Sequence, residues 1–273
     1  MSVFLSVLIV VAVTSVAVAA MLLVRRRAPD GSVFADGDRA SGVFGVLATG
    51  FSVLLGLIVF LAFSSYDQSR AGAETEALLL AQQYETAQFM PVRVRATLGA
   101  DLVCYGRAVV QQEWPKMRAG TEGDSLNPWS VAMFRTLQTI QPKTAPEQSA
   151  YDRWLDQRAD REQARNDRIH GAVGVIPHSL WIVLFFIAGT IFAYMLFFAD
   201  SGERWFAQAM LMGSVVAVIT ATMLLIHFLD SPVRLHGGLQ PVAMKRTLRV
   251  LERERRVVST RTPLPCDSGG AAL

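Results

Sequence analysis

The sequence predicts an all-α, four-span transmembrane helical protein, with an extramembrane helical bundle inserted between the second and third spans. Two observations support this prediction. The chain contains four long apolar runs without Asp, Glu, Lys or Arg, and a polar segment separates the second run from the third. Apolar residues make up 52% of the 273 residues, which suits a chain that lies partly in lipid and partly in water.

Each apolar run is long enough to cross a bilayer, because a helix of about 20 residues spans the roughly 30 Å of hydrocarbon. The runs cover residues 2–24, 43–65, 179–199 and 207–229. The first run carries a pattern typical of a cleavage site at residues 17–19, so the alternative for it is a signal peptide. We favour a retained span, because the arginines at 25–27 follow the apolar run instead of preceding it.

These runs divide the chain into four parts. Residues 1–65 hold the first two spans and a short basic loop, and residues 66–178 form an extramembrane helical domain. Residues 179–230 hold the third and fourth spans, and residues 231–273 form a basic tail. We expect the tail to be partly disordered, beyond Arg261. Its stretch KRTLRVLERERR is typical of an amphipathic or membrane-surface helix, because acidic residues interrupt the basic ones.

The polar segment between the second and third spans is predicted to be helical, with prolines at the helix ends. The second span continues without a breaker, so we expect one helix over residues 43–90, about 70 Å long at about 1.5 Å per residue. Pro91 ends this helix, and Pro115 stops or kinks the next one. A shorter helix is expected at 129–141 and a last one at 145–176.

Small residues share one face of the second span, at helical spacing. Such a face lets two helices approach closely, so it either packs against another helix or lines a narrow pore, and packing is the interpretation that we favour. A similar face on the fourth span precedes His227 and Asp230, which either titrate together or cap the helix end. The face on the second span consists of Gly45, Thr49, Ser52 and Gly56, and that on the fourth of Gly213, Ala217 and Thr220.

Four arginines of the last predicted helix also share one face. We favour a solvated surface with internal pairing, such as Arg158 with Glu162. The alternative is a basic face that attracts anions or anionic headgroups. The face consists of Arg158, Arg161, Arg165 and Arg168.

Basic residues flank the spans on both sides of the membrane. Those in the short loops favour a cytoplasmic position for the loops, whereas those next to the third and fourth spans favour the opposite arrangement, so the two orientations are nearly balanced. The loop residues are Arg25, Arg26, Arg27, Arg39 and Arg204. On the other side lie Arg161, Arg165, Arg168, Arg234, Lys245, Arg246 and Arg249.

Several classes of function lack support. The sequence contains no nucleophile elbow, no HExxH and no phosphate-binding glycine loop, so we expect neither an enzyme nor a cofactor. Cys104 and Cys266 are far apart and give no disulfide framework, and the four histidines show no metal-binding spacing. Nucleic-acid binding is not expected, because the basic tail is interleaved with acids.

Four segments together resemble a known family. They are the second span with its continuation FSSYDQSRAGAETEALLLAQQY, the stretch YGRAVVQQEWPKM, PHSLWIVLFF at the third span and LDSPVRLHGG after the fourth. The chain is similar to bacterial membrane proteins with a bestrophin-like domain, a family defined as a domain of unknown function. Its signature corresponds here to Tyr105, Arg107, Glu113, Trp114 and Pro115. The last segment departs from the family pattern, with Val233 in place of a phenylalanine.

The resemblance implies a function. Bestrophins are pentameric anion channels with four spans per subunit and a large cytoplasmic helical part, although their acidic calcium-binding run is absent here. We therefore expect a multi-pass protein of the cell membrane that associates with itself and passes small anions, with its helical domain weakly favoured as cytoplasmic. The alternative is a non-conducting scaffold or sensor whose helical domain binds a partner. Trp114 either packs against a neighbouring helix, which we favour, or contacts a ligand, and Glu113 caps its helix or pairs with an arginine of the last helix.

Overall fold

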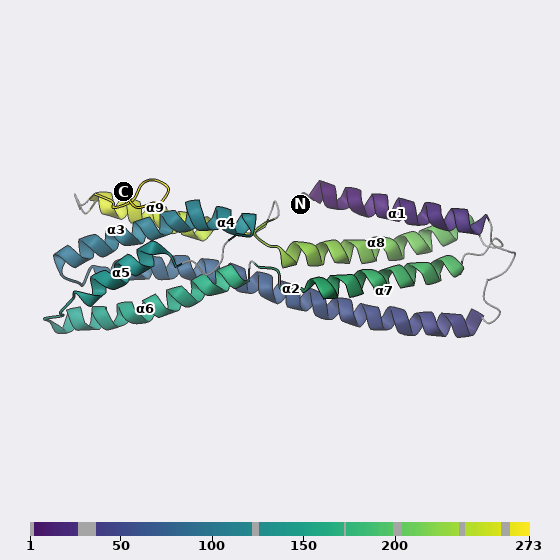
Figure 1. Ribbon diagram of the computed structural model, residues 1–273, viewed down its shortest axis with the longest axis horizontal. Coiled ribbons are helices and arrows are strands. Elements are labelled where there is room, and N and C mark those ends of the chain that lie inside the picture. The colour runs from purple at the N-terminus through teal and green to yellow at the C-terminus, as the bar shows by residue number, and fades with distance from the viewer. Residues whose placement is uncertain are drawn as a thin grey trace. The chain divides into compact units, whose positions relative to one another are not determined.

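A computed structural model of the protein describes residues 3–26, 37–121, 126–171, 173–198, 204–234, 238–257 and 263–273. Within these ranges the regular elements are helices, and the strand-like pairing is an isolated bridge between Cys266 and Ala272. Four helices are long and apolar enough to cross a membrane, which confirms the predicted fold class (Figure 1). They are α1 (Val3–Arg25), α2 (Gly37–Ala87), α7 (His178–Phe197) and α8 (Trp205–Asp230).

The chain forms two compact units. The membrane unit comprises the described residues of 1–65 and 174–231, and the helical unit comprises those of 66–173, 232–234 and 238–273. Helix α2 is one continuous helix that contributes residues to both units. The tail beyond the fourth span therefore belongs to the helical unit instead of forming a separate part.

In the membrane unit, α1 packs along α8. Ala17 and Met21 of α1 are buried against Met212 and Val216 of α8 in one apolar cluster. Gly213 lies at this contact, where a Cβ would be 3.4 Å from the methyl group of Thr14, an ordinary van der Waals distance. The small-residue face of the fourth span thus includes a helix-packing position.

Asp230, the last residue of α8, caps the backbone that precedes α7. Its carboxylate accepts hydrogen bonds from the amides of Val175 at 2.7 Å and Ile176 at 3.0 Å. The interpretation of His227 and Asp230 as a cap on the end of the fourth span is therefore wrong, because Asp230 binds amides of the segment before α7 and not groups at the end of α8. His227 instead faces the ring of Trp181, 6.2 Å away between ring centres.

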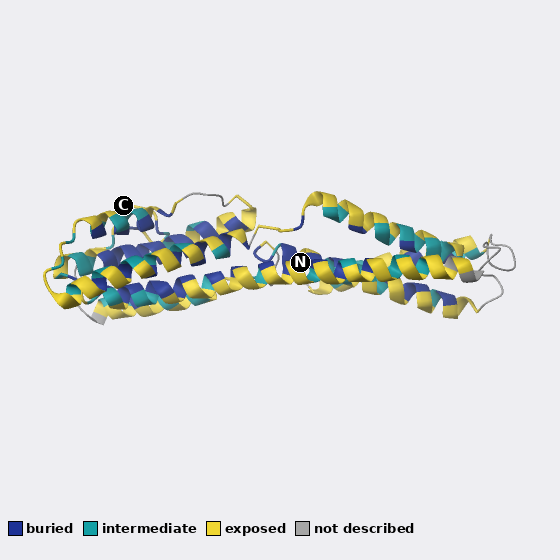
Figure 2. Ribbon diagram, turned by 90° about the horizontal axis from the view of Figure 1, so that it is seen from below, coloured by how far each residue is buried: buried dark blue, intermediate teal, exposed yellow. Residues whose placement is uncertain are grey.

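The helical unit is built around the second part of α2 and five further helices. They are α3 (Val92–Ala108), α4 (Trp114–Ala119), α5 (Pro128–Gln138), α6 (Ala145–His170) and α9 (Val242–Val257). Their inward faces are buried, whereas the outward faces are exposed (Figure 2). Helix α5 begins at the Asn127 cap, and α6 begins at a capping box formed by Thr144 and Glu147.

Pro115 does not stop the second helix of this unit, but the helix departs from α-helical geometry just before it. The helix passes from α3 through a π-helical turn, Val109–Glu113, directly into α4. In this turn the amide of Trp114 donates to the carbonyl of Val109, five residues back, so the chain is already displaced from α-helical register where proline lacks an amide. The helix ends at Ala119, where Gly120 adopts a left-handed conformation with φ of 71°.

The C-terminal region is ordered where it is described, so the prediction of disorder is wrong for residues 263–273; residues 258–262 lie outside the described ranges. The apolar face of α9, with Met244, Leu248 and Leu251, is buried in the core of the helical unit, so α9 is not a membrane-surface helix. Gly106 of α3 permits this packing, because a Cβ there would lie 2.7 Å from Leu248.

Candidate functional site

The arginine face of α6 is turned into the helical unit. Arg161 and Arg168 are fully buried and Arg165 is 5% exposed, so the expectation of an exposed face, whether solvated or anion-attracting, is wrong for these three residues. Arg158 is half-buried, and its guanidinium lies 4.5 Å from the ring centre of Phe134. The predicted pairing partner of Arg158, Glu162, forms its ion pair with Arg161 instead.

Arg168 lies at the centre of a buried charge network. Its Nε donates to Glu76 Oε2 at 2.6 Å, and its Nη2 donates to Glu76 Oε1 at 3.1 Å and to Glu113 Oε2 at 2.5 Å. The guanidinium also lies 5.3 Å from the ring centre of Trp114 and contacts the sulfur of Met117. One arginine of α6 therefore ties α2 to the helix that contains the EWP stretch.

Glu113 forms the second centre of this network. Its Oε1 accepts hydrogen bonds from the guanidinium of Arg165 at 3.3 Å and from the side-chain nitrogen Nδ2 of Asn127 at 2.8 Å. Glu76 in turn accepts a hydrogen bond from the hydroxyl of Tyr105 at 2.6 Å. Of the two alternatives for Glu113, capping its helix or pairing with an arginine of the last helix, the structure shows the pairing.

Arg161 extends the network toward α5. Its guanidinium donates to Gln83 Oε1 at 2.7 Å and to the hydroxyl of Ser130 at 2.9 Å. It also lies over the ring of Tyr105, 4.4 Å from the centre, and is paired with Glu162. The network thus joins α2, α3, α5 and α6 through charged side chains.

Burial and ion pairing act in opposite directions on these groups. Burial by itself would raise the pKa of Glu113, but the guanidinium groups of Arg168 and Arg165 outweigh burial and hold this pKa below its ordinary value. Burial by itself would lower the pKa of Arg168, yet Glu76 and Glu113 keep it above the ordinary value. Both partners are therefore charged, and each depends on the other for its stability in the interior.

The network forms where α2 and α6 touch backbone to backbone. A Cβ on Gly72 would lie 2.6 Å from the amide nitrogen of Arg168 and 2.7 Å from the carbonyl of Ala164. One turn earlier, the hydroxyl of Ser69 donates to the carbonyl of Arg168 at 2.9 Å. This contact fixes the register in which Glu76 meets Arg168.

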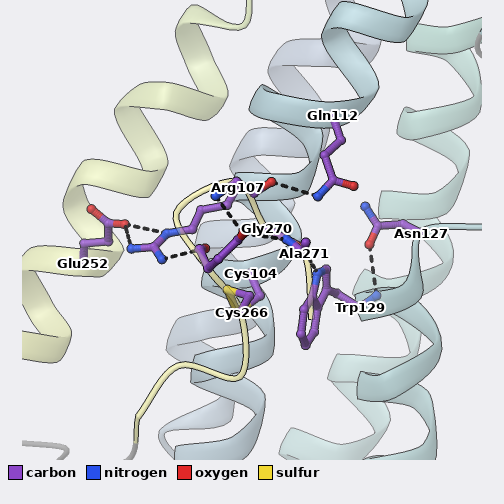
Figure 3. The surroundings of a disulfide bond; sticks show 11 residues. Cys104, Arg107, Gln112, Asn127, Trp129, Glu252, Cys266, Gly270 and Ala271 are labelled. Atoms are coloured by element: carbon purple, nitrogen blue, oxygen red, sulfur yellow. Dashed lines mark hydrogen bonds and ion pairs between the residues drawn. A yellow bond between two sulfur atoms is a disulfide. The ribbon is translucent and has the colours of Figure 1, made fainter. Parts of the chain in front are cut away.

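Two other residues of the family signature act elsewhere. Pro115 occupies the first turn of α4. Arg107 lies outside the network and holds the C-terminal segment: it is paired with Glu252 at 2.7 Å and donates to the carbonyl of Asp267 at 3.1 Å (Figure 3).

Trp114 is 2% exposed and donates to the carbonyl of Leu239, in agreement with the packing interpretation.

Cys104 of α3 and Cys266 of the C-terminal segment form a disulfide, so the inference that they do not constitute a disulfide framework is wrong (Figure 3). Non-covalent contacts place the segment beside α3. Trp129 Nε1 donates to the carbonyl of Gly270 at 2.7 Å, and Gln112 donates to that of Gly269 at 2.9 Å. The pairing depends on the folded tail and has no local sequence signal.

The small-residue face of α2 is exposed in the described part of the membrane unit, although Ser52 at its edge also lines a pocket shared with α7 and α8. Gly45, Thr49, Ser52 and Gly56 are all exposed, and a Cβ placed on Gly45 or Gly56 would meet no other atom within 4 Å. The same is true of Gly50, on a different side of α2. Packing of this face against another span of the same chain is therefore not observed in the described part of the membrane unit.

The membrane unit also contains a large apolar cavity. It has a volume of about 810 Å³ and lies between α1, α7 and α8, with Trp181, Phe185, Phe192 and His227 among its lining residues. In the described parts of the chain, no three His, Cys, Asp or Glu side chains come together in a way that could hold a metal ion.

Four spanning helices and a helical unit with a buried charge network define a class of helical membrane protein. The sequence profile of the bestrophin-like domain matches residues 10–234, and the chain belongs to this family. No curated protein matches the chain.

Solved structures share the fold. A bacterial bestrophin homologue from Klebsiella pneumoniae has a TM-score of 0.65 at 12% identity, and the match covers 92% of this chain and 97% of that chain. A second structure of the K. pneumoniae homologue, from Zn-SAD phasing, has a TM-score of 0.64 at 12% identity, with 96% and 100% covered. A variant described as a membrane protein has a TM-score of 0.64 at 13% identity, with 95% and 98% covered.

Proposed function

We propose that the protein is a homo-oligomeric anion channel of the cell membrane, with the small-residue face of α2 lining its pore. The observation that carries this proposal is the absence of cover on this face within the described membrane unit. A face of Gly, Ser and Thr offers small side chains and hydroxyl groups, and both features suit a narrow conducting path. Membership of the bestrophin-like family supports the proposal, since bacterial bestrophin homologues share the fold.

The buried charge network has a supporting role in this proposal. Its guanidinium groups are held by Glu76, Glu113 and Glu162, so they are not available as an open anion-attracting surface. They instead stiffen the helical unit around the continuation of α2, the helix that carries the proposed pore face. Anion selectivity is therefore assigned to the pore and not to the face of α6.

The test uses purified full-length protein in planar bilayers, with two matched glycine variants of α2. Gly56 lies on the proposed pore face, and Gly50 lies about 120° away around the helix at 3.6 residues per turn. Both have open space at the Cβ position. Gly56→Phe is expected to abolish conductance and Gly50→Phe to retain it, and reversal potentials in asymmetric chloride are expected to follow the anion.

The size of the assembly separates pore lining from subunit packing. If Gly56→Phe abolishes conductance but leaves the oligomer intact on size-exclusion chromatography, the pore assignment holds. If it dissociates the oligomer, the face packs between subunits. Wild-type protein with no conductance above that of empty bilayers, across a range of salts and voltages, would contradict the channel function.

A scaffold or sensor is the second candidate, favoured by the continuity of α2 through both units. A helix of this kind can transmit a change in the helical unit to the membrane unit. Trp114 is not its partner-binding residue in this structure, because the ring is buried against Arg168 and Leu239. Monomeric, non-conducting protein that co-purifies with a partner would favour this candidate.

A further inference from the structure

The disulfide between Cys104 and Cys266 constrains the compartment in which the helical unit folds. Both half-cystines are buried, and the bond joins positions separated by 162 residues. Disulfides of this structural kind persist outside the cytoplasm, whereas cytoplasmic thiols are kept reduced. The bond is therefore evidence about the side of the membrane on which the helical unit lies.

The cysteines meet because the C-terminal segment fits closely against α3. Gly270 adopts a φ of 79°, and a Cβ there would lie 2.4 Å from the amide nitrogen of Ala108. The carbonyl of Gly270 accepts a hydrogen bond from the indole N–H of Trp129, and the carbonyl of Asp267 accepts one from the guanidinium of Arg107. These contacts hold the segment against α3 in addition to the bond, so the pairing is part of the folded unit.

The charge distribution gives a second, independent indication. Arg161, Arg165 and Arg168 are three of the seven basic residues next to the third and fourth spans that balanced the two orientations. They are buried and paired with carboxylates of the helical unit, so they no longer act as a cluster of exposed positive charge near the membrane. Arg234, Lys245, Arg246 and Arg249 remain exposed on that side, against the five basic residues of the short loops, so the count for the positive-inside rule shifts toward cytoplasmic loops.

We propose that the helical unit and the C-terminus lie on the extracytoplasmic side of the membrane, and that the loops after the first and third spans are cytoplasmic. This is the reverse of the side implied by the resemblance to bestrophins, and it is independent of whether the protein conducts ions. Bond formation oxidises two thiols, which lose two protons and two electrons, and a dithiol–disulfide oxidoreductase of that compartment accepts them as its own disulfide is reduced. Ligands or partners of the helical unit would then be extracytoplasmic molecules.

Fusions to the C-terminus of the full chain test the proposal without changing the disulfide. Leu273 is exposed, so a fused domain is accommodated there. Alkaline phosphatase, which is active only after export, is expected to be active at this position, and a green fluorescent protein that matures only in the cytoplasm is expected to be dark. A fluorescent fusion with an inactive phosphatase would overturn the proposal.

Thiol chemistry in intact cells gives a second readout. Cells are quenched with acid, and the protein is alkylated with a maleimide of known mass before or after reduction. We expect no modification before reduction and a mass increase of two maleimides after it, with one site in the Cys266→Ser control regardless of reduction. Two modified thiols in the wild type before reduction would overturn the proposal.

A third measurement places both sides of the membrane. In a background with both cysteines replaced by serine, Arg153→Cys reports on the exposed surface of α6 and Arg204→Cys on the loop before α8. A membrane-impermeant maleimide is expected to label Arg153→Cys in intact cells and Arg204→Cys only after lysis. The opposite pattern, in protein that retains its wild-type elution volume, would overturn the proposal.

Discussion

Glu76 lies on the α2 side of the contact between α2 and α6, and its neutralisation tests how these helices are held together. The side chain is fully buried, with Arg168 at 2.6 Å and the hydroxyl of Tyr105 at 2.6 Å. Glu76→Gln keeps the shape and one acceptor but removes the charge. Breaking a buried ion pair by removing one partner costs about 3–5 kcal/mol.

The expected loss is at the lower end of that range, because Arg168 retains Glu113 at 2.5 Å. A loss of about 3 kcal/mol corresponds to a decrease in Tm of roughly 6–12 °C for a domain of about 150–250 residues. The assay is thermal unfolding of the full chain in detergent, followed by circular dichroism and by a dye that reports exposed apolar surface. All variants are compared in one detergent and at one pH.

Glu74→Gln is the matched control, since it makes the same chemical change two residues away on the same helix. Its pair with Arg70 is solvent-exposed, with both side chains more than half accessible. Exposed ion pairs contribute little to stability, so no resolved shift in Tm is expected. If Glu76→Gln has the same Tm as Glu74→Gln and the wild type, the buried charge network does not hold α2 and α6 together.

Three further predictions concern the helical unit. Burial raises the pKa of Asp101 to about 6, so the folded state holds its proton between pH 4 and 6 and the free energy of unfolding falls as pH rises through this window. Asp101→Asn should remove this pH dependence. At pH values above 6 it should increase the free energy of unfolding, by at most roughly 3 kcal/mol. An unchanged pH profile of unfolding would contradict this prediction. Gly72→Ala should force α2 and α6 apart and lower stability by about 1–3 kcal/mol, whereas Gly50→Ala, in open space, should not; equal melting curves would refute the close contact. Reductant should lower the free energy of unfolding of the wild type by about 2–4 kcal/mol and thus lower its Tm, whereas the Tm of Cys266→Ser should not change. A wild type whose Tm is insensitive to reductant would show that the bond does not stabilise the unit.

The membrane spans and the helical content were predictable because they depend on composition and on short-range periodicity. The arginine face of α6 shows what composition and periodicity cannot predict. Periodicity established that Arg161, Arg165 and Arg168 share a face, but the burial of that face depends on carboxylates from two other helices. One signal was present in the sequence: Ala73, Ala77 and Leu80 share an apolar face of α2, and Glu76 lies at the edge of this face. An acid in such a position indicates a buried partner of opposite charge.

The disulfide and the π-helical turn were not predictable for a different reason. Cys104 and Cys266 are brought together by the path of the C-terminal segment across α3, and no pattern near either cysteine encodes that path. At Pro115 the sequence indicated a stop or a kink. The helix continues instead, with Trp114 packed against Arg168 and Leu239, and the wider π-helical turn accommodates the missing amide.

The carboxylate of Asp230 has a mechanical consequence for the membrane unit. It fastens the exit of the fourth span to the entry of the third, through the amides of Val175 and Ile176. Gly174 leaves room for this clasp, since a Cβ there would lie 2.8 Å from the carboxylate. A sideways displacement of α7 at this end must therefore either carry the end of α8 with it or break both hydrogen bonds to Asp230.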